Sequence, residues 1–549
     1  MKRPRARARR ATRRESFDLD RHGDLLVAIL EEMRASKPKK GRLTRVLRRH
    51  PLPDGRILSK AQLLSGYTQL CEQEGRSPDP KLVRRLRLKP TRTISGVAPV
   101  TVLTKPFPCP GECIFCPVVE GMPKSYLPDE PGAMRGADYE FDPYAQTAGR
   151  VAAMAGIGHN VDKVELLILG GTWSCYPKAY QEWFVRRCLD ALNGDGRESS
   201  TLEEAQRINE TSPHRNVGLV VETRPDCITP EEVRRLRWLG VTKVQLGVQS
   251  MDDRLLARNR RGHTVAETRR AMRLLRLAGF KIVVHWMPNL LGATPEGDLE
   301  DFRRLWKDPA LRPDELKLYP TALLPDTELH ERWLRGEYQP YDEETLVELL
   351  AECKMLIPRY CRVNRLMRDI PAPNIVAGVK RSNLRQIVQR RMAQRGLACH
   401  CIRCREIRGR EVEADTLRFD RLDYETDATR ECFLSYVTPG DRLVGFLRLS
   451  LPQAEPPIAE LAGCAVIREV HVYGPALELG DRQRGTAQHI GLGSQLVEEA
   501  RDIARQEGYG RLAVIAAVGT RPYYRERGFK LDQLYMIGSV HRTGPCGTV

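Results

Sequence analysis

Six short apolar stretches between residues 97 and 320 constrain the fold of this chain more than any other feature. They read VAPVTVLT, VELLILGG, VGLVVET, KVQLGVQS, KIVVHWMP and LKLYP, and longer helical stretches separate them. Runs of Val, Ile and Leu without polar alternation are typical of strands that are covered on both faces. Their alternation with helices predicts a parallel βα sheet. Six repeats favour a complete or partial TIM barrel over a doubly wound nucleotide-binding sheet.

A cysteine triplet lies just after the first of these strands, at Cys109, Cys113 and Cys116. Three closely spaced thiolates can bind three irons of a [4Fe-4S] cluster and leave the fourth iron open, where S-adenosylmethionine can chelate. This spacing predicts a radical enzyme. The alternative is a zinc knuckle, although zinc sites usually come as paired Cys or Cys/His elements that close a tetrahedron.

Residues at the ends of the predicted strands form a second candidate group. In βα barrels the chemistry takes place at the C-terminal ends of the strands. We therefore expect one cavity to be faced by Gly170, Gly171, Glu222, Arg224, Gln249 and His285. Lys317, in LKLYPT, lies at another strand end and is a candidate catalytic contact in the barrel mouth. A stabilising ion pair is an equally good interpretation of this lysine.

The excess of basic residues points to a polyanionic partner. The chain has 89 Lys and Arg against 71 Asp and Glu, a net charge of +18. Nucleic acid is the default partner of such a protein. Basic residues concentrate in the N-terminal arm MKRPRARARRATRR, between residues 80 and 111, and between residues 380 and 410. The arm is open to two interpretations, a solvated tail or a segment that grasps RNA.

The cysteine pattern and the lack of export signals indicate a reducing compartment. Six of the fifteen cysteines lie in two tight triplets, which is metal-ligand usage and not a disulfide framework. The basic arm is not followed by the apolar region of a secretory signal. No apolar stretch approaches the roughly 20 residues that a membrane span needs. We expect a soluble, cytoplasmic protein.

The second triplet, Cys399, Cys401 and Cys404, predicts a structural zinc site. Three thiolates within six residues are too cramped for ordinary disulfides. His400 is adjacent, but the sequence does not select the fourth ligand. Reduced cysteines that never bind metal remain the alternative.

The C-terminal region, from about residue 411, alternates strands with one clear helix that begins near Gly493. Its apolar stripe consists of Leu496, Val497, Ala500, Ile503 and Ala504. Gly491 and Gly493 precede this helix, where backbone N–H groups can approach a pyrophosphate. A lone GxG is weak evidence. Flanking strands and the segment RPYYRERGF favour an acyl-CoA-binding fold, since a Rossmann fold would need a third glycine and an acidic ribose ligand.

The motifs together resemble the catalytic subunit of Elongator, a family that joins a radical S-adenosylmethionine domain to a GNAT acetyltransferase domain. The resemblance runs from about residue 85 to 538 and rests on RTISGVAPVTVLTKP, DPYAQTAGRV, DKVELLILGGT, ETRPD, LGVQS, RRGHT, LKLYPT, REVHVYG and VGTRPYYRERGF. It implies that the first triplet binds the cluster and that the Cys399 triplet is the zinc loop of microbial members. It places the S-adenosylmethionine contacts at Gly170, Gly171, Glu222 and Gln249. It places the acetyl-CoA contacts at Lys163, Glu469, Val470, His471, Val472, Leu492, Gly493, Ser494 and Tyr524.

The resemblance also implies an activity, the conversion of the wobble uridine of tRNA to 5-carboxymethyluridine with acetyl-CoA as donor. The partners would be a tRNA anticodon stem-loop and an external electron donor, without a requirement for other Elongator subunits. Tyr524 or Tyr523 could protonate the thiolate leaving group, and for each tyrosine a packed aromatic is the alternative. The competing functions are a protein lysine acetyltransferase with a structural iron-sulfur domain, and an RNA-binding scaffold without activity.

We therefore expect four units along the chain. Residues 1–92 form a basic helical region that binds tRNA, and residues 93–345 form the radical S-adenosylmethionine domain. Residues 346–410 form a helical linker with the zinc loop, and residues 411–549 form the acetyltransferase domain.

Overall fold

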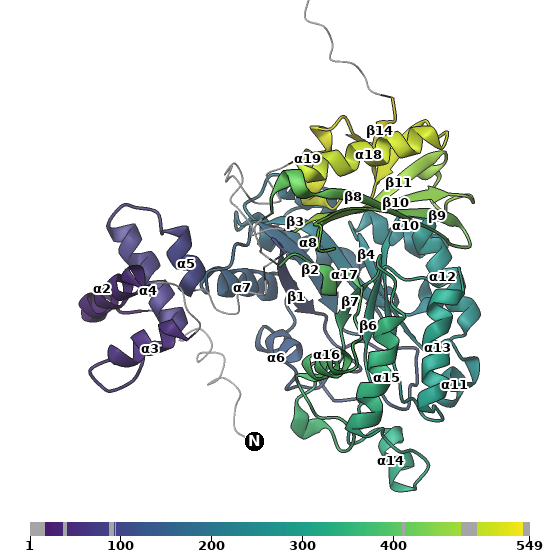
Figure 1. Ribbon diagram of the computed structural model, residues 1–549, viewed down its shortest axis with the longest axis horizontal. Coiled ribbons are helices and arrows are strands. Elements are labelled where there is room, and N and C mark those ends of the chain that lie inside the picture. Colours follow the sequence, from purple (N-terminus) through teal and green to yellow (C-terminus); the bar gives the residue numbers. More distant parts are fainter. Residues whose placement is uncertain are drawn as a thin grey trace, which may run out of the picture.

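The computed structural model describes residues 17–36, 41–86, 93, 95–408, 412–473 and 491–541. The basic arm at residues 1–14, the basic loop before Gly491 and most of the C-terminal tail lie outside the described residues. Figure 1 shows three parts: a small helical group to one side, a parallel sheet wrapped in helices, and a second sheet above it.

The predicted parallel βα sheet is confirmed and has seven strands. They follow one another in chain order, and each neighbouring pair is parallel. Since the first and last strands are the edges, the sheet is an open, partial barrel. The strands are β1 (Ala98–Leu103), β2 (Lys163–Leu169), β3 (Arg215–Thr223), β4 (Lys243–Gln249), β5 (Lys281–Trp286), β6 (Glu315–Leu318) and β7 (Arg362–Arg365).

The seventh strand corrects the expectation that residues 346–410 are a helical linker. β7 pairs with β6 and buries Val363. Its sequence, RVNR, contains no apolar run, so strand periodicity could not reveal it. The rest of this segment is helical, with α15 (Glu343–Met355), α16 (Leu384–Gln394) and α17 (Ile402–Arg405).

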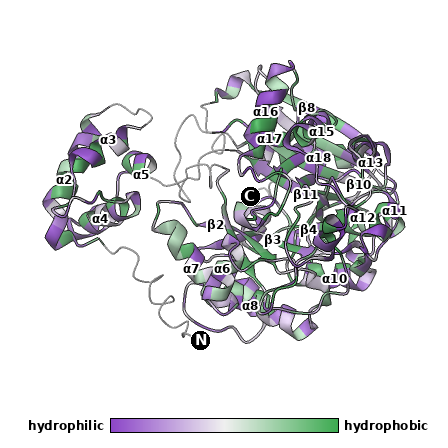
Figure 2. Ribbon diagram, turned by 90° about the horizontal axis from the view of Figure 1, so that it is seen from below, coloured by the Kyte–Doolittle hydropathy of each residue, from purple (hydrophilic) through white to green (hydrophobic). Residues whose placement is uncertain are grey.

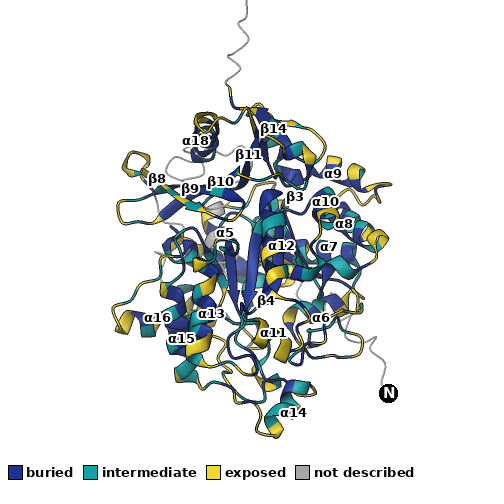
Figure 3. Cartoon of the chain, turned by 90° about the vertical axis from the view of Figure 1, so that its right-hand side faces the viewer, coloured by how far each residue is buried: buried dark blue, intermediate teal, exposed yellow. Residues whose placement is uncertain are grey.

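Threonine side chains start most of the helices that cover the barrel. Thr229, Thr264 and Thr294 each accept a hydrogen bond from a backbone N–H in the first turn of the next helix, which satisfies a donor that the helix itself leaves unpaired. Figure 3 shows buried faces of these helices turned toward the strands. The helices are α6 (Pro131–Asp138), α7 (Pro143–Ala155), α8 (Lys178–Asn193), α9 (Leu202–Asn209), α10 (Pro230–Trp238), α11 (Asp253–Arg258), α12 (Val265–Leu277), α13 (Pro295–Lys307) and α14 (Glu328–Leu334).

The C-terminal sheet also has seven strands, in the order β13-β14-β12-β11-β10-β9-β8, and only β11 and β12 are parallel neighbours. The predicted helix is confirmed as α18 (Leu492–Gln506), which buries all five residues of the expected stripe against one face of the sheet. The remaining elements are β8 (Arg418–Glu425), β9 (Thr429–Val437), β10 (Leu443–Pro452), β11 (Cys464–Val472), β12 (Arg511–Val514), α19 (Arg521–Arg525), β13 (Lys530–Leu531) and β14 (Met536–Ser539).

The other face of the C-terminal sheet closes the N-terminal end of the barrel. One continuous apolar core contains side chains from both sheets, including Val244 and Ile282 of the barrel and Phe446 and Val466 of the second sheet. At Gly279, which precedes β5, a Cβ atom would lie 2.8 Å from a methyl group of Val466, so this contact requires glycine. The two sheets therefore form one packed body.

The N-terminal helices form a separate cluster with its own small core, as Figures 1 and 2 show. Its first helix is α2 (Leu19–Ala35), which buries Leu26, Ile29, Leu30 and Met33. The others are α3 (Arg42–Arg49), α4 (Lys60–Gln73) and α5 (Pro80–Leu86). Within the described part of the chain, no helix has both the length and the apolarity that a membrane span needs.

Candidate functional site

The first cysteine triplet lies on the loop that follows β1, at the C-terminal end of the barrel. Cys113 is buried, and Cys109 and Cys116 are half-buried. Arg261 donates a hydrogen bond from Nη1 to Sγ of Cys113 over 3.4 Å. A hydrogen bond from Cys116, aided by the nearby Arg261 charge, lowers the pKa of the Cys113 thiol to about 5 despite its burial. The site therefore favours a thiolate, which is the form that binds iron.

The sulfur positions distinguish the two cysteine triplets. The sulfurs of Cys399, Cys401 and Cys404 all lie within 4.8 Å of one another, and this is the one such group of three or more ligands found in the described part of the chain. Thiolates on a single tetrahedral zinc are about 3.8 Å apart, given a Zn–S bond of about 2.3 Å. The more widely spread first triplet fits separate irons of a cluster better than one ion.

A glycine cradle lies beside the cluster loop. Gly170 and Gly171 follow β2 with φ of +139° and +101°. A Cβ on Gly170 would lie 1.8 Å from the hydroxyl oxygen of Thr104, so the turn accepts no side chain there. The hydroxyl of Thr172, the next residue, contacts Sγ of Cys109 at 3.4 Å. The backbone of this turn can therefore approach a group bound at the cluster.

Two residues that line a cavity at the ends of the strands each have a buried polar atom without a hydrogen-bond partner in the structure. These atoms are Oε1 of Gln249 and Nη1 of Arg224. Gln249 also has φ of +74°, which is uncommon for a residue other than glycine. An unsatisfied acceptor and donor at the end of β4 and β3 suit a bound polar ligand such as S-adenosylmethionine.

The expectation that six strand-end residues face one cavity is confirmed for five of them. A cavity of about 650 Å³ is lined by Gly171, Glu222, Arg224, Gln249 and His285, together with Cys109 and Cys116 of the cluster loop. Gly170 lies just behind it, where its carbonyl oxygen accepts a hydrogen bond from the Tyr176 hydroxyl. The cavity is large enough for a nucleoside-sized ligand.

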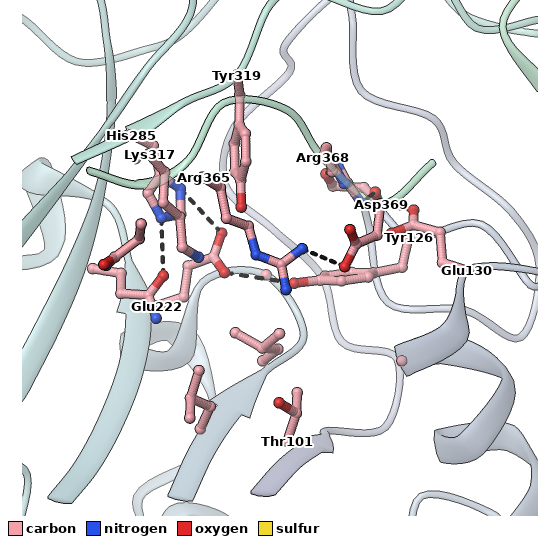
Figure 4. A pocket seen from close by; sticks show the side chains of 18 of the residues that line it. Thr101, Tyr126, Glu130, Glu222, His285, Lys317, Tyr319, Arg365, Arg368 and Asp369 are labelled. Carbon is pink, nitrogen blue, oxygen red and sulfur yellow. Dashed lines mark hydrogen bonds and ion pairs between the residues drawn. The ribbon is translucent and has the colours of Figure 1, made fainter. Parts of the chain in front are cut away.

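Glu222 lies at the centre of the barrel mouth, as Figure 4 shows. Its carboxylate is 3.7 Å from Nδ1 of His285 and 3.5 Å from the hydroxyl of Tyr126. Nε2 of His285 is 3.0 Å from Oε1 of Gln245. Burial, and then the positive charge of Lys317, lower the pKa of His285 far below its ordinary value. His285 is therefore neutral at physiological pH.

Lys317 lines the same cavity from the end of β6. The side chain is buried, and within the described residues no carboxylate lies within ion-pair distance of Nζ. Its nearest ring is Tyr319, whose centroid is 5.6 Å away. Burial lowers the pKa of Lys317 to about 8. The negative charge of nearby Glu222 acts in the opposite direction, so an electrostatic contact with that carboxylate stays the alternative interpretation of this lysine.

A second cavity, of about 220 Å³, lies between the barrel floor and the C-terminal sheet. Among its lining residues are Glu469, Val470, His471 and Tyr524. Burial raises the pKa of the Tyr524 hydroxyl, so it stays protonated and can donate a proton. Nε2 of His471 is buried without a hydrogen-bond partner.

Gly493, the second residue of α18, packs beside Tyr523 and Val472 at the end of β11. A Cβ on Gly493 would lie 2.8 Å from the Tyr523 hydroxyl oxygen and 3.8 Å from a methyl group of Val472. Ser494 accepts hydrogen bonds from the guanidinium of Arg527. Leu492, Gly493 and Ser494 thus begin a helix beside the end of β11, which is the geometry of an anion site at a helix N-terminus.

Two of the predicted acetyl-CoA contacts, Glu469 and Lys163, differ from the others in their environment. Glu469 forms ion pairs with Lys281 and Arg448, and although burial opposes ionisation these cations lower the pKa of its carboxyl. Glu469 therefore holds the two sheets together as well as lining the cavity. Lys163, the first residue of β2, is half-buried and does not line either of the two cavities.

The two cavities adjoin inside the barrel. Both are lined by Ser95, Val97, Glu165, Lys243, Glu315 and Arg362. At this junction Nζ of Lys243 lies 2.7 Å from Glu165 and 3.4 Å from Glu315. The cluster loop and the cavity beneath β11 are thus opposite ends of one polar interior.

Several residues of the site could not be found from sequence reasoning. Arg261 reaches Cys113 across 148 positions of the chain, and Thr172 reaches Cys109 across 63. Arg261 lies in the motif RRGHT, but no spacing rule connects that motif to the cysteine loop. Only the folded sheet brings the loops after β1, β2 and β4 together.

Comparisons with known proteins match both halves of this arrangement. Residues 108–305 match the Radical SAM superfamily, residues 313–394 its C-terminal domain, and residues 400–529 the acetyltransferase (GNAT) family. The predicted combination of a partial barrel with a GNAT domain is thereby confirmed.

Full-length relatives show the same combination. A tRNA uridine(34) acetyltransferase of Dehalococcoides mccartyi is 45% identical over 456 residues, which cover 82% of this chain and 98% of the relative. Elongator complex protein 3 of Homo sapiens is 39% identical and covers 83% and 86% of the two chains. The solved structure of the archaeal Methanocaldococcus infernus Elp3, with residues 1–46 deleted, has a TM-score of 0.72 at 39% identity and covers 81% of this chain and 100% of that one.

Proposed function

This chain belongs to the family of the tRNA uridine(34) acetyltransferases and Elongator complex protein 3, and we propose that it converts uridine 34 of tRNA to 5-carboxymethyluridine with acetyl-CoA as donor. It is an acyltransferase that combines a radical SAM domain with a GNAT domain. The observation that carries the proposal is the junction of the two cavities, because an acyl donor at β11 and a base at the barrel mouth then share one interior.

The cluster-binding residues in this proposal are Cys109, Cys113 and Cys116. Gly170, Gly171, Glu222 and Gln249 would hold S-adenosylmethionine. When bound, the cluster and S-adenosylmethionine supply the carbon-radical chemistry that activates an unactivated C–H bond. The barrel residues that line the cavity would limit the access of water to this chemistry.

Lys317 would recognise the uracil, across the cavity from the cofactor contact Glu222. A base that is extruded into a pocket is recognised through hydrogen bonds to its edge. The ammonium of Lys317 has no carboxylate partner among the described residues and would donate to a uracil carbonyl oxygen. Glu222, held by Tyr126 and His285, would orient the ligand on the other side of the cavity.

Tyr524 would act on the acyl donor. Glu469, Val470, His471 and Val472 of β11, the first residues of α18 and, by family resemblance, Lys163 would bind acetyl-CoA. The protonated Tyr524 hydroxyl would pass its proton to the thiolate of coenzyme A as the thioester is cleaved. Water would attack the acyl carbon, the C–S bond would break, and the acyl carbon with the oxygen of that water would become the carboxylate of the product.

The substrate would be the anticodon stem-loop, whose unstacked bases can be splayed into a pocket. Exposed arginines on α3, including Arg45, Arg48 and Arg49, support phosphate binding by the N-terminal helices. Protein lysine acetylation is not favoured, because the relatives named for an activity are named for tRNA. An inactive scaffold is not favoured either, since both cavities retain polar groups without partners.

Three further elements belong to the proposal. A structural zinc at Cys399, Cys401 and Cys404 is supported by their compact sulfur group. An external one-electron donor is required by the cluster, and independence from other Elongator subunits is supported by the bacterial and archaeal relatives that are named for the activity alone. A cytoplasmic location is supported by the described cysteines, all of which are free thiols.

The test is nucleoside mass spectrometry of tRNA after anaerobic incubation with the reconstituted protein, reductant, S-adenosylmethionine and acetyl-CoA. We expect 5-carboxymethyluridine with the native protein and none with Cys113→Ala. Cys432→Ala, at a buried cysteine of β9 outside both cavities, is the matched control and should retain activity. Cleavage of S-adenosylmethionine without any modified uridine would contradict the proposal.

A further inference from the structure

A pair of thiols lies beside the cluster loop and has no part in the function proposed above. Sγ of Cys175 is 3.8 Å from Sγ of Cys227, although 52 positions separate them in the chain. Cys175 ends the short turn after β2, and Cys227 ends the corresponding turn after β3. Both side chains are half-buried, and neither lines either of the two cavities.

The two turns that carry these thiols also carry contacts to the cluster-binding loop. Thr172, three residues before Cys175, contacts Cys109. Arg224, three residues before Cys227, is held by Asp226 and packs so closely on Gly111 that a Cβ there would lie 2.2 Å from its Nη1. A bond between the thiols would therefore join the two loops that flank the cluster cysteines.

The electrostatic surroundings make the two thiols unequal. A hydrogen bond from Cys227 lowers the pKa of Cys175, and the nearby Arg224 acts in the same direction, while burial, Asp226 and Glu232 oppose it. The same hydrogen bond and burial raise the pKa of Cys227. A half-buried thiol of lowered pKa beside a thiol of raised pKa is the arrangement of an attacking and a resolving cysteine.

We propose that Cys175 and Cys227 are a redox modification site, a dithiol that closes to a reversible disulfide and so ties together the loops after β2 and β3. The sulfurs need to approach by less than 2 Å, because a disulfide bond is about 2.0 Å long. Each thiol lies on a turn of three residues, so the approach involves two short segments. The site is independent of the tRNA modification proposed above.

The reaction is thiol–disulfide exchange with a small-molecule disulfide as oxidant. The Cys175 thiolate attacks one sulfur of the oxidant, forms a mixed disulfide and releases one thiolate of the oxidant. The Cys227 thiol then loses its proton and attacks the Cys175 sulfur, and the second thiolate of the oxidant leaves. The protein loses two hydrogen atoms in total, and the oxidant is reduced to two thiols.

The test uses the cluster-loaded protein under anaerobic conditions with glutathione disulfide as the probe. After incubation, free thiols are blocked with N-ethylmaleimide, the protein is digested, and the peptides are analysed by mass spectrometry. The visible absorbance of the cluster is followed throughout to show that Cys109, Cys113 and Cys116 stay engaged. The buried Cys188 and Cys353 serve as internal controls that should remain reduced.

We expect a peptide pair linked through Cys175 and Cys227 in the native protein, and its loss after addition of dithiothreitol. In Cys227→Ser the exchange should stop at a glutathione adduct on Cys175. In Cys175→Ser the remaining Cys227 should stay reduced. Two free thiols, or two separate glutathione adducts without a link, in the native protein would overturn the proposal, and so would an unmodified Cys175 in Cys227→Ser.

Discussion

The guanidinium of Arg468, on β11, lies 2.6 Å from the carboxylate of Asp314, which precedes β6, and neither side chain is exposed to solvent. Arg448 and Arg276 approach the same carboxylate at 3.4 Å and 3.7 Å. Burial opposes ionisation of Asp314, but these arginines outweigh it and lower the pKa of the carboxyl. Asp314 thus joins arginines of the C-terminal sheet to the barrel.

We predict that Asp314→Asn destabilises the whole protein. Removing one partner of a buried ion pair leaves uncompensated charge and costs about 3–5 kcal/mol. The free energy of unfolding in urea should show this loss. Because the folded-state pKa is lowered, the contribution of Asp314 is present above its unfolded pKa and is lost only as pH falls through the lower folded value. Asp502→Asn, which removes an exposed partner of Arg505, is the control and should have a small effect. An equal effect of both substitutions would contradict the role of Asp314.

We predict that tRNA modification declines above pH 8 because Lys317 loses its proton. The pKa of this amine is lowered to about 8, so it is charged at neutral pH and becomes neutral as the pH rises. Lys317→Gln should reduce the rate by about 10- to 100-fold at pH 7, the range expected for a lost hydrogen bond from a charged group, and should abolish the decline. Initial rates between pH 6.5 and 9 measure both effects. The exposed Lys530→Gln is the matched control, and a decline that persists in Lys317→Gln would argue against this lysine.

We predict that Tyr524→Phe slows thioester cleavage without weakening acetyl-CoA binding. Loss of a general acid typically reduces the rate by about 10²- to 10⁴-fold. Coenzyme A release, followed with a thiol reagent, gives the rate, and calorimetry gives the affinity. Tyr523→Phe is the control, because Tyr523 does not line the cavity beneath β11. If only the Tyr523 variant lost activity, Tyr523 and not Tyr524 would be the general acid.

We predict that the native protein contains zinc and that Cys401→Ala loses it. Removing one thiolate leaves too few ligands to close a tetrahedron. Metal analysis by mass spectrometry after anaerobic purification should show about one zinc per chain in the native protein and close to none in the variant. Cys361→Ala removes a neighbouring buried cysteine outside the sulfur group and should keep the metal. A native protein without zinc would show that these three cysteines are reduced thiols that do not bind metal.

We predict that exposed arginines on α3 contribute to tRNA binding. Replacing Arg45 and Arg48 together with alanine should weaken binding and lower the slope of log Kd against log salt by about one for each lost phosphate contact. Filter binding across a salt series measures the slope. Arg254→Ala, at a highly exposed arginine of α11, is the control. An unchanged slope in the double variant would exclude these arginines from the interface.

Sequence patterns predicted those elements whose signal lies within a short segment of the chain. The apolar runs predicted six of the seven barrel strands, and the spacing of Cys109, Cys113 and Cys116 predicted their loop. The stripe from Leu496 to Ala504 predicted α18. Each of these signals lies within a few residues, so periodicity and spacing detect it.

Contacts between residues that are far apart in the chain could not be predicted from the sequence. β7 carries no apolar run, and its pairing depends on β6 being in place. Ion pairs such as Arg468 with Asp314 cross 154 positions, and the Cys175–Cys227 contact crosses 52. The side-chain surroundings of Lys317 and Glu469 also depend on neighbours from distant strands: the charge of Glu222 acts on Lys317, and Glu469 forms ion pairs with Lys281 and Arg448.

The shared apolar core has a consequence for how the enzyme would meet its substrate. Domains that are joined by a large hydrophobic interface do not swing as independent bodies. Because Val466 packs closely on Gly279, the contact between the two sheets leaves no room for a hinge motion at this point. Under the proposed function, the sites for the acyl donor and the cluster would therefore keep a fixed separation, and the tRNA would have to turn its base out to reach them.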